Sequence, residues 1–280
     1  MKENLQPPSF IGIGAQRAGT SWLYNCLRDH PEIYMPQKEV HFFDIHYEKG
    51  IEWYFDLFYP LSKGIRSGEI TPDYMFDEQA ILRLKKHAPD TKLIVILRSP
   101  LDRAYSAYNL FRSHGRYSDI DFDQAVTKDP FILEQSLYSP QIERIFNLFP
   151  RENIHICFYE DIASSPNLFF KNVCNFLNID GNFVPDTLKV RKNSSAFSSQ
   201  QRVFNIPKIQ KNIEDSILGR PFKKLKKTKA FSVLKEKIIS FDNKKKTIPT
   251  LSKDKLLLIE NDIARLETIL NISLNRWRQL

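Results

Sequence analysis

Three segments of this chain have the pattern of a buried strand that leads directly into a turn and a helix. The strand segments are mostly apolar, which is typical of strands covered on both faces, and they lie at residues 10–13, 92–98 and 154–162. Apolar residues at helical spacing follow each strand, over residues 22–27, 101–113 and 168–177. This alternation predicts an α/β fold in which helices flank both faces of a parallel, P-loop-like β-sheet.

Further elements are expected around these three units. They are a short strand at 65–70, helices at 78–87 and 140–149, and an amphipathic helix from Ser252 onward. Ser139 is the expected cap of the helix at 140–149. The length of 280 residues suits one or two domains. We expect a single domain, 1–280, with a nucleotide-binding and catalytic core at 8–180 and a helical C-terminal extension at 252–280.

The first strand leads into a loop that looks like a phosphate-binding loop without its lysine. In the sequence GIGAQRAGTSW, Gly14 and Gly19 have the spacing of a Walker loop, but Thr20 stands where that loop has lysine. The cation of this loop is Arg17, which lies inside it. Backbone N–H groups at a helix N-terminus bind anions, so the loop is expected to hold a phosphate-like group.

The second strand also ends in a cation. A Walker enzyme needs an acidic residue at the end of a neighbouring strand to hold Mg²⁺, whereas this strand ends in Arg98. Two arginines and no acid at the strand ends favour direct binding of anions, without a metal. A nucleotide that carries phosphate groups at two places would suit this arrangement.

Positive charge is concentrated in one late segment. Residues 201–247 contain twelve lysines and two arginines against four acidic residues, a local charge of +10 in a chain of +8 overall. The segment lacks the interleaved aromatic residues of a base-stacking surface, so nucleic acid is disfavoured as a partner. The charge is compatible with an acidic acceptor or with peripheral contact to a membrane surface.

The N-terminus, the lengths of the apolar segments and the cysteine positions lead us to expect a cytoplasmic protein. The N-terminus lacks the apolar region of a signal peptide, and no segment approaches the ~20 apolar residues of a membrane span. The three cysteines lie singly in apolar segments, without metal-ligand spacing, and are expected to be buried, reduced thiols. The sequence does not indicate an oligomeric state.

Several motifs, taken in order, resemble those of sulfotransferases that use 3′-phosphoadenosine 5′-phosphosulfate (PAPS). The resemblance is to the branch that includes carbohydrate and heparan sulfotransferases, in a bacterial-type form, and it covers roughly residues 8 to 180. GAQRAGTSWL is similar to the family's 5′-phosphosulfate loop, and Arg98 and Ser106 in ILRSPLDRAYSAY match its 3′-phosphate motif. KEVHFFD, residues 38–44, matches the segment with the family's catalytic carboxylate, and GEITPDY, residues 68–74, also fits.

The resemblance implies a role for each candidate residue. The group that would hold the 5′-phosphosulfate is Arg17, Ala18, Gly19, Thr20, Ser21 and Trp22. Arg98 and Ser106 would clamp the 3′-phosphate. The catalytic group would be Glu39 as general base, His41 as an orienting or assisting residue, and Arg17 at the leaving group. Lys38 would contact the sulfuryl group or the acceptor.

Other interpretations of these residues stay open. Glu39 and His41 could be an exposed loop pair beside core phenylalanines, and Lys38 could be a surface charge. Arg98 could pair with Asp102 or Glu69 in a purely structural role.

The function implied is transfer of a sulfuryl group from PAPS to a hydroxyl of a glycan, glycolipid or small molecule. The product would be adenosine 3′,5′-bisphosphate (PAP), and no metal would be required. Relatives that act on heparan-type chains often have lysine where Ile70 stands, which disfavours a highly sulfated acceptor. The alternatives are a P-loop kinase or nucleotide hydrolase, and a non-catalytic protein that binds nucleotides or nucleic acid.

Overall fold

The computed structural model describes residues 5–59, 62–191 and 251–278. The chain divides into two units, one formed by residues 1–186 with 248–280 and the other by residues 187–247. The second unit, including the Lys-rich segment 201–247, lies almost wholly outside the described residues. The expected single domain therefore stays a prediction.

A five-stranded parallel sheet forms the centre of this unit. The strand order is β2-β3-β1-β4-β5. The strands are β1 (Phe10–Gly14), β2 (Ile33–Tyr34), β3 (Arg66–Ile70), β4 (Lys92–Leu97) and β5 (Ile154–Phe158). Central strand β1 pairs with β3 on one side and β4 on the other, with Phe10 opposite Gly68 and Lys92. All five residues of β1 are buried, as expected for a strand covered on both faces.

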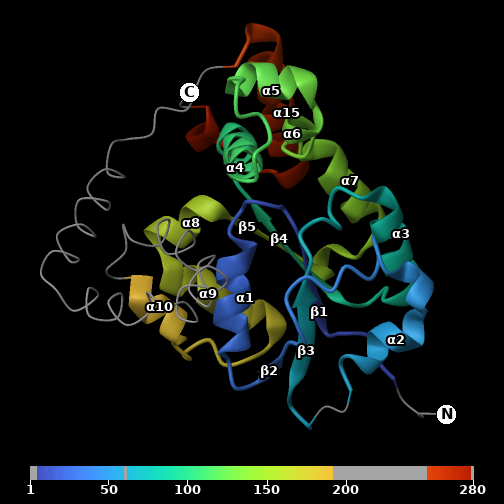
Figure 1. Ribbon diagram of the computed structural model, residues 1–280. Helices are drawn as coiled ribbons and strands as arrows, with labels where there is room; N and C mark the ends of the chain where they lie inside the picture. The colour runs from blue at the N-terminus through green and yellow to red at the C-terminus, as the bar shows by residue number, and fades with distance from the viewer. Residues whose placement is uncertain (1–4, 60–61, 192–250, 279–280) are drawn as a thin grey trace, which may run out of the picture. The chain divides into compact units, whose positions relative to one another are not determined.

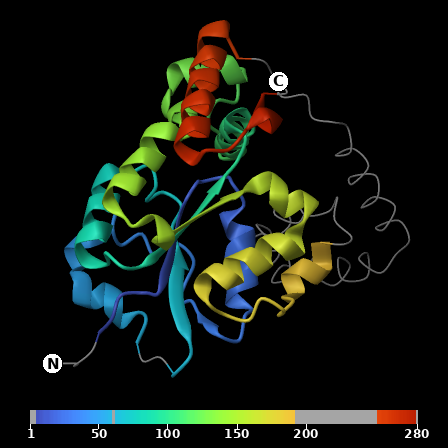
Figure 2. The ribbon, with the colours of Figure 1, turned by 180° about the vertical axis from the view of Figure 1, so that it is seen from behind.

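Helices cover both faces of the sheet (Figures 1 and 2). One face carries α1 (Thr20–Arg28), α8 (Tyr159–Ser164) and α9 (Pro166–Leu177). The other carries α2 (Ile51–Asp56), α3 (Glu78–His87) and α7 (Ser139–Leu148). The predicted α/β fold with a flanked parallel sheet is thus confirmed. The remaining helices are α4 (Pro100–Ser113), α5 (Phe122–Lys128), α6 (Phe131–Glu134), α10 (Asp186–Arg191) and α15 (Lys253–Leu270).

Two expectations about individual elements are wrong. The strand expected at 154–162 ends at Phe158, and the polar residues that follow it begin helix α8. Ser139 is the first residue of α7 and not its cap. The helices α2, α5 and α6 have 6, 7 and 4 residues, and segments this short do not show a helical period in the sequence.

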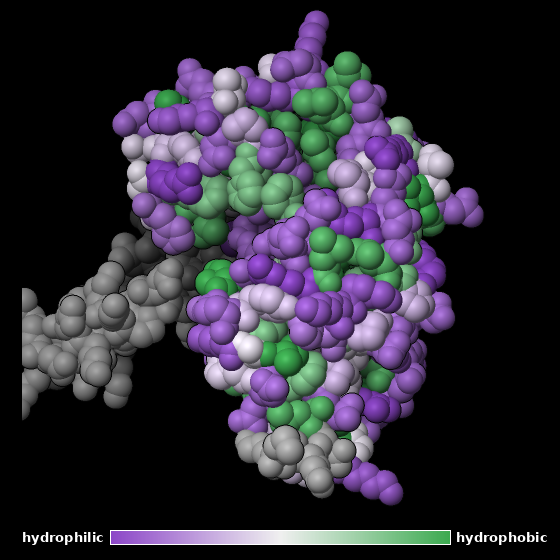
Figure 3. All heavy atoms as spheres, turned by 90° about the vertical axis from the view of Figure 1, so that its right-hand side faces the viewer, coloured by the Kyte–Doolittle hydropathy of each residue, from purple (hydrophilic) through white to green (hydrophobic). Residues whose placement is uncertain are grey.

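The cysteines, the helix hydropathy and the surface of the described residues can be compared with the sequence predictions. Cys26, Cys157 and Cys174 are free and buried, as expected. Within the described ranges, no helix is both long enough and apolar enough to cross a bilayer. Figure 3 shows one face of the molecule, where apolar side chains stand in small groups among hydrophilic ones.

The C-terminal helix α15 packs against α7 through a buried carboxylate. Asp262 accepts hydrogen bonds from the backbone N–H groups of Tyr138 at 2.7 Å and Ser139 at 3.0 Å, and from the Ser139 hydroxyl at 2.6 Å. The Tyr138 hydroxyl donates in turn to the backbone oxygen of Arg98 at 3.0 Å. Asp262 therefore caps α7 from a distant part of the chain, next to the end of β4.

Replacing Asp262 with alanine is expected to lower the free energy of unfolding by about 1–2 kcal/mol, because two amides and a hydroxyl lose their acceptor. Urea unfolding followed by circular dichroism measures this change. Glu260→Ala, on an exposed position of the same helix, is the control and should leave stability nearly unchanged. Equal effects of the two substitutions would contradict the capping role.

Candidate active site

The loop between β1 and α1 has the backbone geometry of an anion-binding turn. Gly19 precedes the helix with a φ of 96°, in the left-handed region that glycine favours. A Cβ at Gly19 would lie 2.9 Å from Ile162 and 3.0 Å from Tyr159, so helix α8 also excludes a larger residue there. The Trp22 and Leu23 N–H groups donate to the Gly19 oxygen at 3.0 and 3.2 Å, whereas those of Thr20 and Ser21, at the very start of α1, have no acceptor within the helix. The turn can therefore offer them to an anion.

Two arginines and a serine meet beside this loop. The Arg17 Nε–H donates to the Ser106 hydroxyl at 3.1 Å, and Arg98 donates from Nη1 to the backbone oxygen of Arg17 at 3.1 Å. The Arg98 guanidinium stacks on the Tyr159 ring, 4.5 Å from its centre. Burial and the positive charge of Arg98 lower the pKa of Arg17. The structure thus brings together Arg17, Arg98 and Ser106, with the Arg17 side chain directed to Ser106.

The local contacts of these arginines fit a polyanionic ligand. In the part of the chain that the structure describes, the buried Arg98 Nε has no hydrogen-bond partner and neither arginine forms an ion pair. Among the described residues, Arg98 forms no ion pair with Asp102 or Glu69. Two guanidinium groups at the end of a parallel sheet, without a carboxylate partner, are suited to bind phosphate oxygens.

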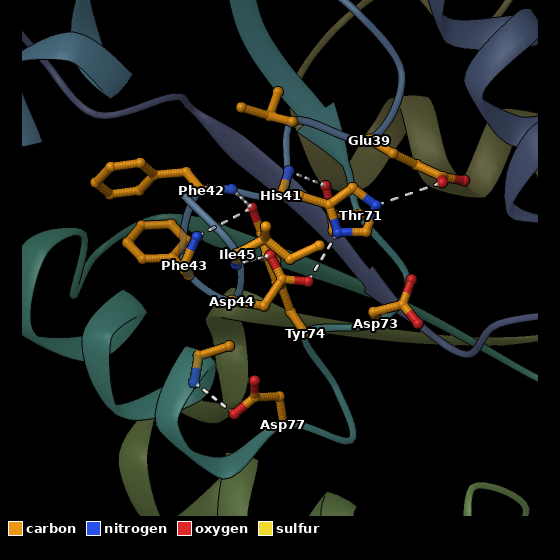
Figure 4. A network of polar contacts seen from close by, with 12 residues as sticks. Glu39, His41, Phe42, Phe43, Asp44, Ile45, Thr71, Asp73, Tyr74 and Asp77 are labelled. Carbon is orange, nitrogen blue, oxygen red and sulfur yellow. Dashed lines mark hydrogen bonds and ion pairs between the residues drawn. The ribbon is translucent and has the colours of Figure 1, made fainter. Parts of the chain in front are cut away.

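A second loop, residues 38–44, carries the predicted catalytic carboxylate. The His41 Nε2 lies 3.6 Å from a carboxylate oxygen of Glu39, and Nδ1 lies 2.8 Å from a carboxylate oxygen of Asp44 (Figure 4). Lys38 forms an ion pair with the other oxygen of Glu39. All four side chains are at least partly accessible. The side chains of Lys38, Glu39 and His41 are therefore close together.

The backbone of this loop differs from the extended segment that was expected. Glu39 and His41 both have left-handed backbone conformations, with φ of 60° and 53°. Such angles are uncommon for residues other than glycine and often occur at functional sites. The two side chains come together through these turns and not through the two-residue period of a strand.

Sequence analysis missed two acidic residues at this site. Asp44 holds the His41 ring, and its position three residues after His41 was the available signal. Asp73 lies near the same ring, as Figure 4 shows, and accepts a hydrogen bond from the Gln16 side chain at 3.1 Å. Because Gln16 is part of the phosphate-binding turn, this bond joins the two loops. Burial raises the pKa of Asp73.

The charges around His41 favour its protonated form. Burial alone would lower the pKa of His41, but the hydrogen bond and charge of Asp44, with the charges of Asp73 and Glu39, raise it above its ordinary value. Within the described residues, no group of three or more His, Cys, Asp or Glu side chains is arranged to hold a metal ion. The expectation that no metal is required stays a prediction.

Asp44→Asn is expected to lower the pKa of His41, because it removes a negative charge that stabilises the imidazolium. Titration of the histidine ring by NMR measures the shift. Asp73→Asn is the matched control: it removes a charge that has no direct bond to the ring, and should lower the same pKa by less. An unchanged pKa in Asp44→Asn would contradict the proposed cause.

These features define an α/β protein with a P-loop-like turn, whose arginine pair lies close to a carboxylate–histidine loop. The chain belongs to the sulfotransferase family: the model of the sulfotransferase domain matches residues 7–244. Mouse heparan sulfate glucosamine 3-O-sulfotransferase 3B1 is 32% identical over 184 residues, covering 62% of this chain and 47% of the relative. The membrane-associated sulfotransferase kil1 of Dictyostelium discoideum is 26% identical over 274 residues, covering 64% and 58%.

Solved structures agree on the fold. A sulfotransferase from Alicyclobacillus acidocaldarius superposes with a TM-score of 0.69 at 23% identity, covering 98% of this chain and all of the other. The chain spans about half the length of the mouse relative, 47%.

Proposed function

We propose that this protein transfers a sulfuryl group from PAPS to a hydroxyl of a carbohydrate-containing acceptor. The observation that carries the proposal is the arrangement of two loops. One brings Arg17, Arg98 and Ser106 together, the other holds Glu39 against His41, and the bond from Gln16 to Asp73 joins them. Family membership supplies the sulfuryl chemistry for this arrangement.

In the proposed complex, the donor has two anionic ends that match two parts of the site. Arg98 and Ser106 would bind the 3′-phosphate, as the unpartnered Arg98 Nε and the nearby Ser106 hydroxyl suggest. The 5′-phosphosulfate would bind to the turn formed by Arg17, Ala18, Gly19, Thr20, Ser21 and Trp22. Arg17 lies against Ser106, so its guanidinium can also contribute to the 3′-phosphate.

The reaction would be an in-line displacement at sulfur. The acceptor oxygen forms a bond to sulfur while the bond from sulfur to the 5′-phosphate oxygen breaks and leaves PAP. Glu39 takes the proton from the acceptor hydroxyl, and the cations of the turn stabilise the negative charge that develops on PAP. His41, held by Asp44, would place its imidazole beside Glu39 and the reacting group. Lys38, paired with Glu39, would contact the sulfuryl group or the acceptor.

The names of the relatives support a carbohydrate acceptor. The mouse relative is named for glucosamine in heparan sulfate, and we propose a glucosamine-containing or similar glycan for this chain. Glu39, Asp44 and Asp73 place three carboxylates near the reacting centre. This charge favours a neutral acceptor over a highly sulfated one. Cytoplasmic localisation and contact with a membrane surface stay predictions.

Calorimetric titration with PAP and with ATP, each with and without Mg²⁺, tests the proposal. We expect PAP to bind tightly and without dependence on Mg²⁺, and ATP to bind much more weakly. Incubation with PAPS and a glucosamine-containing oligosaccharide should then yield PAP and a sulfated sugar. Tighter, Mg²⁺-dependent binding of ATP would instead support a kinase or nucleotide hydrolase, and binding without transfer to any hydroxyl would support a non-catalytic role.

A further inference from the structure

Five successive backbone amides of the catalytic loop are held by one short segment of the chain. The loop residues 39–43 follow no helix or strand pattern, yet each of their N–H groups donates to residues 69–74, at and after the end of β3. The pairs are Glu39 to the Ile70 oxygen at 3.1 Å, Val40 to Glu69 at 3.3 Å, His41 to the Thr71 hydroxyl at 3.3 Å, and Phe42 and Phe43 to the Tyr74 hydroxyl at 2.7 and 3.4 Å. Side chains, not backbone, accept four of the five bonds.

The centre of these contacts is a carboxylate that solvent does not reach. Glu69 is 0% exposed. It accepts hydrogen bonds from the hydroxyls of Thr71 at 2.6 Å, Tyr54 at 2.6 Å and Tyr74 at 3.2 Å. Burial raises the pKa of Glu69, while these donors lower it part of the way. All the groups that bond to Glu69 are donors, so its carboxylate form matches its surroundings.

The carboxylate determines which way the hydroxyls point. A hydroxyl has one proton to donate, and Thr71 and Tyr74 donate theirs to Glu69. Their lone pairs are then left to accept from the loop amides. An uncharged amide in place of Glu69 would present its own N–H groups to one of these hydroxyls. That hydroxyl could then no longer donate to residue 69, and its proton would point toward the loop N–H that it now accepts from. The hydroxyl O–H and the loop N–H, both donors, would then face each other.

We propose that Glu69 is a positioning residue: through the Thr71 and Tyr74 hydroxyls it fixes the left-handed backbone that brings Glu39 to His41. The inference rests on the proposed function, since Glu39 is the base of that reaction. The loop contains two non-glycine residues at positive φ, a conformation that persists only where surrounding contacts enforce it. The bonds from residues 69–74 provide that enforcement.

The test compares a substitution that removes the Thr71 hydroxyl with one that keeps it. Thr71→Val removes the acceptor of the His41 amide, and should slow single-turnover transfer from PAPS to a glucosamine-containing oligosaccharide about tenfold, the loss of roughly one hydrogen bond. Thr71→Ser keeps the hydroxyl and should stay within about twofold of the wild type. Tyr54→Phe removes a donor to the same carboxylate that contacts no loop amide, and should also transfer at nearly the wild-type rate.

Two further measurements separate positioning from general stability. Amide hydrogen exchange of residues 40–43 should speed up in Thr71→Val and in Glu69→Gln, but not in Thr71→Ser or Tyr54→Phe. The affinity for PAP should be nearly unchanged in all four, because the hydrogen bonds of Thr71, Glu69 and Tyr54 are made with one another and with the catalytic loop, and not with Arg17, Arg98 or Ser106. The Thr71 pair decides the question even where Glu69→Gln does not fold.

Equal transfer rates and equal exchange in Thr71→Val and Thr71→Ser would overturn the inference. An exchange and transfer loss in Tyr54→Phe as large as that in Thr71→Val would do so as well, since it would indicate general destabilisation. Failure of the proposed function looks different: the wild type itself would give no sulfated product, while the exchange pattern of residues 40–43 would still report on the Glu69 contacts.

Discussion

Replacing Glu39 with glutamine should lower the rate of sulfuryl transfer by about 10²–10⁴-fold, the usual contribution of a positioned general base. Glutamine keeps the size and polarity of the side chain but cannot take the proton from the acceptor hydroxyl. The proximity of Glu39 to His41, at 3.6 Å, supports a role at the reacting centre. Single-turnover transfer from PAPS to a glucosamine-containing oligosaccharide measures the change.

Two control measurements make this result specific. PAP affinity and melting temperature should be nearly the same in Glu39→Gln and the wild type, because the carboxylate does not belong to the arginine site. His41→Ala should cost less activity, since an orienting group contributes less than the base. A stable Glu39→Gln protein that transfers at the wild-type rate would refute the general-base role and direct attention to His41. Parallel losses of activity, stability and PAP affinity would indicate that Glu39 acts through loop packing.

Replacing Arg98 with alanine should weaken PAP binding by about 1.5–3 kcal/mol, or roughly 10- to 150-fold, as expected for hydrogen bonds to a charged group. The buried Nε of Arg98 has no hydrogen-bond partner among the described residues, and the guanidinium forms no ion pair there. Calorimetry with PAP measures the loss. Adenosine 5′-phosphosulfate, which has no 3′-phosphate, should bind the variant and the wild type almost equally.

Arg112→Ala is the matched control for this experiment. Arg112 is exposed near the end of α4 and contacts Tyr108, so its loss removes the same charge without touching the site. It should leave PAP affinity within about twofold, because exposed charges are strongly screened in physiological salt. Equal losses for PAP and adenosine 5′-phosphosulfate in Arg98→Ala would show that Arg98 maintains the turn and does not recognise the 3′-phosphate.

Much of the fold could be predicted because buried parallel strands can be recognised from their own residues. A strand buried on both faces is continuously apolar, as β1 and β4 are, and it needs no information from distant residues. The boundary between β5 and α8 was harder, since the aromatic residues Phe158 and Tyr159 continue the apolar run across it. The strand ends at Phe158 and helix α8 begins at Tyr159. The residues on the two sides of this boundary are too similar for the sequence to locate it.

The site was predictable in its members but less so in its geometry. Arg17 and Arg98 were identified from their places after apolar strands, and Ser106 from the family resemblance; the structure places the three side chains close together. The contacts of Arg17 with Ser106 and of Asp73 with Gln16 join residues 89 and 57 positions apart. No local pattern encodes such pairs. Glu69 shows the same limit, because its sequence neighbours do not indicate that it lies beneath the catalytic loop.

The bond from Asp262 to the start of α7 has a consequence for the order in which this protein matures. Asp262 follows Tyr138 by 124 residues, so a ribosome synthesises the whole sheet long before it supplies the cap of α7. Domains generally fold from the N-terminus during synthesis. Here the backbone N–H of Tyr138 has its acceptor only after Asp262 has been synthesised, and the hydroxyl of the same tyrosine bonds to the Arg98 backbone. A nascent chain that ends before α15 therefore has the strands of the nucleotide site without its final support. Capture of immobilised PAP by ribosome-bound chains should therefore increase once Asp262 has left the exit tunnel.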